Sequence, residues 1–185
     1  MIKVNVEINN RSWRKEIKNP KKYFSEKLKK INLQVSKLAK QQHRYFFKDN
    51  TKRGKNNITF NILLTDSLNM KRLNKKFLRK CKSTDVLSFP NYHTGKLNIW
   101  SRKFSEENLY EQIDLMTNKS KRIFLGDIAI DYEMINSRSK GNNFHLEFDK
   151  AWIHGLLHLL GFDHKKDKDF FEMERLEKRF LNLVC

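Results

Sequence analysis

The sequence is poor in cysteine, proline and long apolar runs. Its two cysteines, Cys81 and Cys185, lie far apart in the 185 residues, which excludes a disulfide framework and a metal site built from several cysteines. No segment approaches the roughly 20 apolar residues of a membrane-spanning helix. Residues 1–8 alternate apolar and polar side chains, unlike the continuous apolar core of a signal peptide. We therefore expect a soluble, cytoplasmic protein.

Acidic residues are scarce relative to basic ones. The chain carries 39 lysines and arginines against 21 aspartates and glutamates, a formal net charge of +18. Such a charge attracts polyanions at long range, and nucleic acid is the obvious partner. Biased nucleotide usage in the genome would give the same composition, with the extra lysines forming a solvated surface. Charge alone does not decide between these two interpretations.

Hydrophobic periodicity predicts one α+β domain over residues 1–185, without repeats or linkers. A period of two predicts a mixed sheet of about four strands, and helical spacing predicts helices that pack on it. The expected strands are residues 2–8, 58–64, 86–90 and 124–130. The expected helices are residues 20–46, 67–73, a segment from 131, 148–160 and 167–184. Residues 91–122 are polar and aperiodic, and we expect a surface insertion there, helical around 106–116.

Three histidines and a glycine between 154 and 164 indicate a metal site. His154 and His158 lie one helical turn apart on the same face. Gly161 is the residue type that ends a helix in a left-handed conformation, which lets the chain reverse and present His164. Three nitrogen ligands with a fourth position open are typical of catalytic zinc, although nickel, copper and iron also suit imidazoles. The alternative, that these are ordinary core histidines on a leucine-rich helix, fits three such residues poorly.

The spacing matches the zincin arrangement H-E-x-x-H-x-x-G-x-x-H, but Gly155 occupies the position of the glutamate. In a metalloprotease that glutamate takes the proton from zinc-bound water. Its absence argues against peptide hydrolysis by that route. We expect a zincin-like helix that carries the metal ligands but serves a different reaction.

Several separated blocks point to one family. Segment 154–164 fits the signature H-G-x-L-H-L-x-G-x-D-H, residues 84–90 read T-D-V-L-S-F-P, and residues 125–128 read L-G-D-I. Met173 and Glu177 fit a C-terminal M-x-x-x-E. In these blocks the chain resembles the YbeY endoribonucleases, bacterial rRNA maturation factors. The resemblance implies a metal-dependent, single-strand-specific endoribonuclease that matures the 3′ end of small-subunit rRNA, takes part in ribosome quality control, and has RNA and the ribosome as partners.

The sequence departs from this family at a block of the form L-N-x-x-[YF]-R. Residues 73–77 match it, but Leu78 stands at the arginine position and Arg79 follows one residue later. The family arginine is thought to contact RNA, so Arg79 is the candidate for that role. The insertion at 91–122 is a second departure, because it is longer than usual for the family.

The remaining candidate residues each have a functional and a plain interpretation. The metal would bind water or a phosphate oxygen and stabilise charge on the phosphorane. Asp163 would orient a ligand imidazole, or simply form a turn. Thr84 and Asp85 line the cleft or cap a strand end, whereas Asp127 and Asp131 fit strand-end and helix-cap roles better. A basic cluster lies near Phe77 and consists of Lys75, Lys76, Lys80 and Lys82. These lysines would bind phosphates while the Phe77 ring stacks on a base, or they would simply form a solvated helix end.

Two other functions remain open from the sequence. The chain could be a ribosome-associated assembly factor with a structural metal and little nuclease activity. It could also be a metal hydrolase of small molecules or peptides, which its basic composition makes the weakest alternative.

Overall fold

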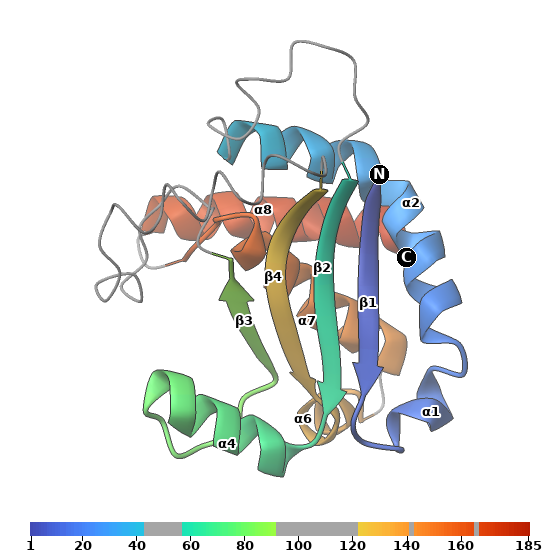
Figure 1. The fold of residues 1–185 in the computed structure, drawn as a ribbon, viewed down its shortest axis with the longest axis vertical. Helices are drawn as coiled ribbons and strands as arrows, with labels where there is room; N and C mark the ends of the chain where they lie inside the picture. Colours follow the sequence, from blue (N-terminus) through green and yellow to red (C-terminus); the bar gives the residue numbers. More distant parts are fainter. Residues whose placement is uncertain (43–56, 92–121, 141–142, 165–166) are drawn as a thin grey trace.

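The computed structural model describes residues 1–42, 57–91, 122–140, 143–164 and 167–185. These residues form a mixed sheet of four strands, with helices on both faces (Figure 1). The strands lie in the order β1-β2-β4-β3. They are β1 (Ile2–Ile8), β2 (Asn57–Thr65), β3 (Val86–Pro90) and β4 (Arg122–Asp131). The predicted α+β class and four-stranded mixed sheet are confirmed.

Six helices lie within the described residues. They are α1 (Trp13–Glu16), α2 (Pro20–Gln42), α4 (Ser67–Leu78), α6 (Tyr132–Arg138), α7 (Phe144–Leu159) and α8 (Asp167–Val184). Residues 43–46 of the predicted first helix and residues 92–121 of the predicted insertion lie outside the described residues. The other predicted helices are confirmed, with different bounds for two of them.

One predicted helix begins earlier than expected, and one short helix was not predicted. Helix α7 begins four residues before the predicted Phe148, because Asn143 caps it by accepting a hydrogen bond from the backbone N–H of His145 at 2.9 Å. Helix α1 lies outside the predicted helices, because its four residues are too few to show a helical period. It forms around the fully buried Trp13, whose indole N–H donates to the carbonyl of Thr65 at 2.9 Å.

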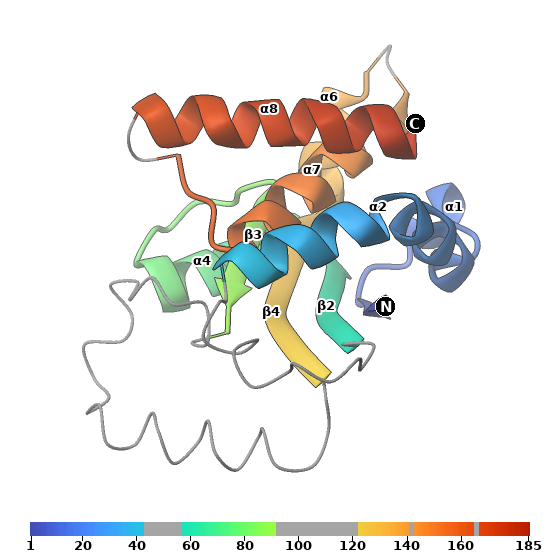
Figure 2. The same ribbon diagram turned by 90° about the horizontal axis from the view of Figure 1, so that it is seen from above.

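The sheet separates a large core from a small one. Strands β1 and β2, and β2 and β4, pair in parallel, while β3 pairs antiparallel with β4 at the edge. On one face α2 and α7 cover the strands, and α8 packs across both helices as an outer layer (Figure 2). On the opposite face Met70 of α4 packs with Leu87 and Ala129. Helix α7 therefore lies directly over β3 and β4.

A buried polar network joins α2, α7 and α8. Asp149 of α7 is only 1% exposed, and it accepts hydrogen bonds from the Tyr23 hydroxyl at 2.8 Å, the Trp152 indole at 2.7 Å and the Lys27 ammonium at 2.6 Å. Lys27 also donates to the carbonyl of Val184 at 3.2 Å. Burial, reinforced by the charge of Asp149, raises the pKa of Tyr23, so its hydroxyl stays a donor. The network fixes α8 relative to α7.

Within the described residues, none of the helices combines the length and the apolar composition that a membrane-spanning helix needs.

Candidate metal centre

Helix α7 and the turn that follows it bring the three predicted histidines together. His154 and His158 lie one turn apart, with ring centroids 4.6 Å from each other. The helix then ends at Gly161, whose φ of 92° is the left-handed conformation that its residue type predicted. The Gly161 N–H donates to the carbonyl of His158 at 3.0 Å. This reversal returns the chain so that His164 faces the other two rings, at centroid distances of 5.5 and 5.1 Å.

The nitrogen atoms of this histidine cluster have the spacing of ligands to one ion. One ring nitrogen from each of His154, His158 and His164 lies within 4.8 Å of the others. The Nε2 atoms of His154 and His158 are 3.0 Å apart. Two imidazoles on a tetrahedral zinc with bonds of about 2.0–2.1 Å have nitrogens about 3.3 Å apart. The cluster could therefore hold one metal ion with little movement.

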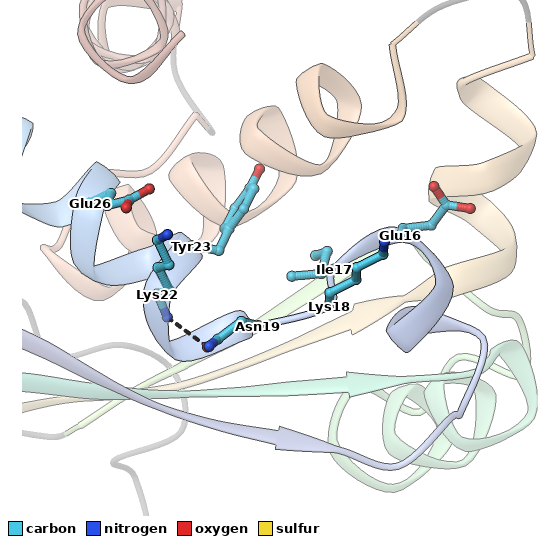
Figure 3. Close-up of a pocket in the computed structure, with 7 residues that line it drawn as sticks. All are labelled: Glu16, Ile17, Lys18, Asn19, Lys22, Tyr23 and Glu26. Atoms are coloured by element: carbon cyan, nitrogen blue, oxygen red, sulfur yellow. Dashed lines mark hydrogen bonds between the residues drawn. The ribbon is translucent and has the colours of Figure 1, made fainter.

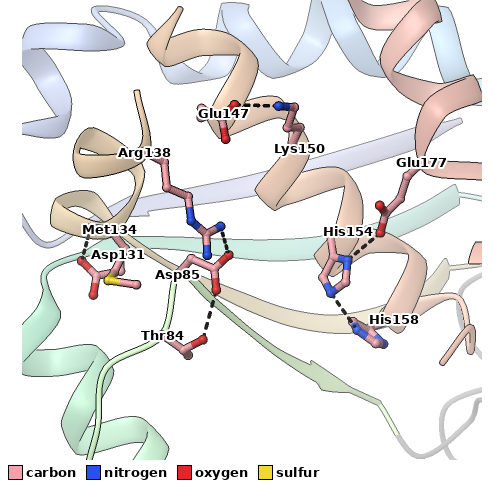
Figure 4. A network of polar contacts seen from close by, with 10 residues as sticks. All are labelled: Thr84, Asp85, Asp131, Met134, Arg138, Glu147, Lys150, His154, His158 and Glu177. Atoms are coloured by element: carbon pink, nitrogen blue, oxygen red, sulfur yellow. Dashed lines mark hydrogen bonds and ion pairs between the residues drawn. The ribbon is translucent and has the colours of Figure 1, made fainter. Parts of the chain in front are cut away.

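Hydrogen bonds at the far side of two rings decide which nitrogen carries the proton. His154 Nδ1 lies 2.5 Å from the Glu177 carboxylate (Figure 4). His158 Nδ1 lies 2.9 Å from the carbonyl of Phe162. Both partners only accept, so each Nδ1 bears the hydrogen and each Nε2 presents a lone pair. In these tautomers the two Nε2 lone pairs would repel each other at 3.0 Å, and both would be available as ligands to one bound cation.

The protonation of His158 also suits metal binding. Burial, followed by the neighbouring charge of His154, lowers the pKa of His158 to about 4. Its imidazole is therefore neutral at neutral pH, which is the form that ligates a metal.

The contact of Glu177 with His154 was not predicted. The sequence resemblance matched Glu177 to a family block without a role, and its partner lies on a different helix. Met173, one turn earlier on α8, is buried in the core. The packing of Met173 seats α8 on α7, so that Glu177 projects toward the ring of His154 (Figure 4). A carboxylate in this position holds the tautomer and raises the basicity of the ligand nitrogen.

Replacing Glu177 with glutamine is expected to weaken zinc affinity by about 10- to 100-fold, because the neutral amide holds the imidazole less firmly and does not raise its basicity. Competition with a chromophoric chelator measures the affinity. Glu174→Gln is the matched control, since Glu174 lies on the same helix and pairs with Lys178 at 2.9 Å. Equal zinc affinity in the Glu177 variant and wild type would remove this role.

Gly155 faces the sheet, which explains why the zincin glutamate has no counterpart here. A Cβ atom at this position would lie 2.9 Å from Cγ2 of Ile128 and 3.1 Å from Oγ of Ser88. The Ser88 hydroxyl donates to the carbonyl of Gly155 at 3.3 Å. The missing side chain lets α7 approach β3 and β4 closely. A glutamate here would point into the sheet instead of toward the histidine cluster.

Asp163 makes the contact expected of a turn-forming aspartate. Its Oδ1 accepts a hydrogen bond from the backbone N–H of His164 at 2.8 Å. Its charge also acts on His158, where it raises the pKa against the larger effect of burial. A direct effect of Asp163 on the orientation of an imidazole stays a prediction.

The predicted basic cluster lies at the end of α4. Lys75 and Lys76 are in its last turn, and the chain then turns at Arg79, whose φ of 57° makes it the only non-glycine residue with positive φ in the described part of the chain. The Asn74 amide donates to the carbonyl of Lys82 at 2.7 Å and holds residues 80–82 against the helix end. Leu78, at the family's arginine position, is 39% exposed.

Phe77 connects this cluster to the sheet. Its ring contacts that of Phe89 on β3, with centroids 5.0 Å apart, and the ammonium of Lys76 lies 5.3 Å from its centroid. Helix α7 packs on the opposite face of β3. The basic cluster and the histidine cluster are therefore attached to the same edge strand.

The aspartates at the strand ends have the plain roles that were favoured. Asp131 is fully buried and caps α6, where it accepts from the backbone N–H groups of Glu133 and Met134 at 3.0 and 3.3 Å. Asp85 precedes β3 and accepts a hydrogen bond from the Thr84 hydroxyl at 3.0 Å. Its other oxygen lies 2.5 Å from the guanidinium of Arg138 (Figure 4).

A surface pocket of about 310 Å³ lies at the junction of α1 and α2 (Figure 3). Its walls carry both signs of charge, from Glu16 and Glu26 and from Lys18 and Lys22. None of its residues belongs to the histidine cluster, and the mixture of charges favours no one class of ligand.

The chain is similar in sequence to proteins described as Endoribonuclease YbeY. A family model described as Endoribonuclease YbeY matches residues 8–184. An Endoribonuclease YbeY of Pelagibacter ubique is 37% identical over 181 residues, which cover 96% of this chain and 92% of that protein. One of Wigglesworthia glossinidia brevipalpis is 35% identical over 126 residues, covering 66% of this chain and 68% of that protein. A solution structure of TM1509 from Thermotoga maritima covers 100% of this chain and 89% of its own, at 21% identity and a TM-score of 0.45. By the family model and these relatives, the chain belongs to the YbeY endoribonuclease family.

Proposed function

We propose that this chain is a zinc-dependent endoribonuclease that cuts single-stranded RNA, matures the 3′ end of small-subunit rRNA and takes part in ribosome quality control in the cytoplasm. The observation that carries the proposal is the pair of Nε2 atoms 3.0 Å apart, on two imidazole rings that are each held by a hydrogen bond at the opposite nitrogen. The proposed unit is one domain, residues 1–185, including the surface insertion at 91–122.

The ligands in this proposal are His154, His158 and His164. Bound zinc would supply a Lewis acid that stabilises negative charge developing on the phosphate under attack. Glu177 and the carbonyl of Phe162 keep two of the imidazoles oriented with their Nε2 atoms toward that position. Asp163 would add negative charge beside His158.

Substrate binding is assigned to the basic cluster at the end of α4. Lys75, Lys76, Lys80 and Lys82 would neutralise phosphates, a contribution that does not depend on base sequence. Phe77 offers a ring on which an unpaired base can stack, and such stacking favours single strands. Both features lie beside β3, whose other face carries the histidine helix.

Arg79 is the proposed substrate-contacting residue of this cluster. A non-glycine residue in the left-handed region costs about 1 kcal/mol or more, and such strain persists mainly at functional positions. Glycine would relieve the strain, so we infer that the side chain of Arg79 has a role that glycine cannot fill.

Replacing Arg79 with glycine is therefore expected to raise the free energy of unfolding by up to about 1 kcal/mol, since glycine adopts this conformation without strain. The same change should lower RNA cleavage. Urea denaturation and cleavage assays measure the two effects on the same protein. Arg72→Gly, in the interior of α4, is the control and should destabilise the fold. A stabilised Arg79 variant with full activity would show that the arginine has no part in cleavage.

Metal removal tests the function as a whole. Protein purified with zinc should cut a labelled single-stranded RNA covering a precursor small-subunit rRNA 3′ end, and should leave its duplex form intact. Dialysis against a chelator should stop the cleavage, and added zinc should restore it. A folded, zinc-loaded protein that binds this RNA without cutting it would favour the alternative, an assembly factor whose metal is structural.

A further inference from the structure

We propose that Arg138 and Lys150 form a phosphate-binding wall beside the histidine cluster, which holds the RNA strand on the side away from the basic cluster at α4. The inference rests on the proposed function and deepens it, because it assigns a second place where the same substrate is held. Neither residue belongs to a sequence block that matched the family.

Lys150 shares a helix face with the metal ligands. It lies four residues before His154, which places its side chain one turn away on the same side of α7, about 6 Å along the axis. Lys150, His154 and His158 therefore form a continuous stripe. The side chain of Lys150 is 48% exposed, and its ammonium lies 2.6 Å from the Glu147 carboxylate. One ion pair leaves two of its three N–H donors for a ligand.

Arg138 reaches the same region from α6. Its side chain is 50% exposed and extends toward the start of β3, where its Nη1 lies 2.5 Å from Asp85. Figure 4 shows this guanidinium reaching from α6 to the segment that carries Thr84 and Asp85, just before β3, the strand on which α7 packs. Thr84 donates to the second oxygen of Asp85 at 3.0 Å, which holds the carboxylate in place. A guanidinium held on one side by a carboxylate keeps its remaining N–H donors for phosphate.

The chemistry favours phosphate over a purely structural role. Exposed ion pairs such as these two stabilise a fold by little, so folding does not require them. Two cations on two different helices that face one region beside the metal ligands match the repeating charge of a nucleic-acid strand. An RNA strand bound both at the basic cluster and at this wall would pass over the histidine cluster.

The salt dependence of RNA binding tests the inference. Fluorescence anisotropy would follow a labelled single-stranded RNA binding to the full chain, in chelator so that the RNA stays intact. For single strands, the slope of log K against log salt concentration is negative, and each lost phosphate contact reduces its magnitude by about 0.7. Lys150→Ala and Arg138→Ala should each show this loss, and the double variant should show about twice as much. Lys150→Arg should keep the wild-type slope.

Lys178→Ala is the matched control, because Lys178 is 70% exposed and pairs with Glu174 on α8 in the same manner. It should leave the slope unchanged. If Lys150→Ala and Arg138→Ala both showed the same salt-dependence slope as the wild-type protein, the inference would be overturned and the proposed function would remain intact. Reduced slopes in a protein that never cuts RNA when loaded with zinc would support the wall and remove the nuclease function.

Discussion

Replacing His158 with alanine is expected to abolish both zinc retention and RNA cleavage. His158 supplies one of three nitrogens within 4.8 Å of each other, and its ring centroid lies 4.6 and 5.1 Å from those of His154 and His164. Loss of a group that merely supports a ligand weakens metal binding by about 10- to 100-fold, so loss of the ligand itself should exceed about 100-fold. Cleavage of the precursor rRNA 3′ end and zinc content by mass spectrometry give the two readouts.

His145→Ala is the control for this experiment. His145 lies at the start of the same helix, where it stacks on Tyr23 with centroids 5.6 Å apart, and it is not part of the histidine cluster. The variant should keep its zinc and its activity. Equal cleavage by the His158 variant and wild type would trace the activity to a contaminating nuclease, and the assembly-factor function would then explain the chain better.

Replacing Gly155 with glutamate restores the zincin motif in the sequence, yet it is expected to unfold or severely destabilise the protein. The new side chain would meet Ile128 and Ser88 instead of the metal ligands. Overpacking and burial of an unpaired carboxylate should together cost at least about 3 kcal/mol. No peptidase activity should appear, and RNA cleavage should be lost because α7 is pushed away from the sheet.

Urea denaturation followed by circular dichroism measures the loss for Gly155→Glu. Gly155→Ala gives a milder comparison, because its single methyl group meets only side-chain atoms, which can shift. This variant is expected to lose about 1 kcal/mol of unfolding free energy. A Gly155→Glu protein as stable as wild type, or one that hydrolyses peptides, would mean that this position faces the metal site after all.

The parts of the site that depend on local spacing could be predicted from the sequence. His154 and His158 needed only the helical period, and Gly161 needed only its freedom to adopt a φ of 92°. The strands could be predicted equally well, because apolar and polar side chains alternate regularly in β1 and β2. Asp131 was also predicted correctly as a helix cap.

The parts that depend on tertiary packing could not be predicted. The contact between Glu177 and His154 requires α8 to pack against α7 at one particular position along the α7 axis. The pairing of Arg138 with Asp85 likewise joins segments that are distant in the sequence. Helix α1 was missed because four residues are too few for a period, and only the burial of Trp13 against the sheet explains it.

The order of the elements along the chain has a consequence for zinc supply. All four described strands are complete by Asp131, before His154 is synthesised, and the leucines around the histidines belong to the main hydrophobic core. Zinc fingers, by contrast, stay unfolded without their metal. A cell short of zinc is therefore expected to accumulate this protein folded and inactive, as a reserve that zinc can activate without new synthesis. A cooperative thermal unfolding transition in the metal-free protein, at a lower temperature than in the zinc-loaded protein, would support this, and the absence of such a transition would contradict it.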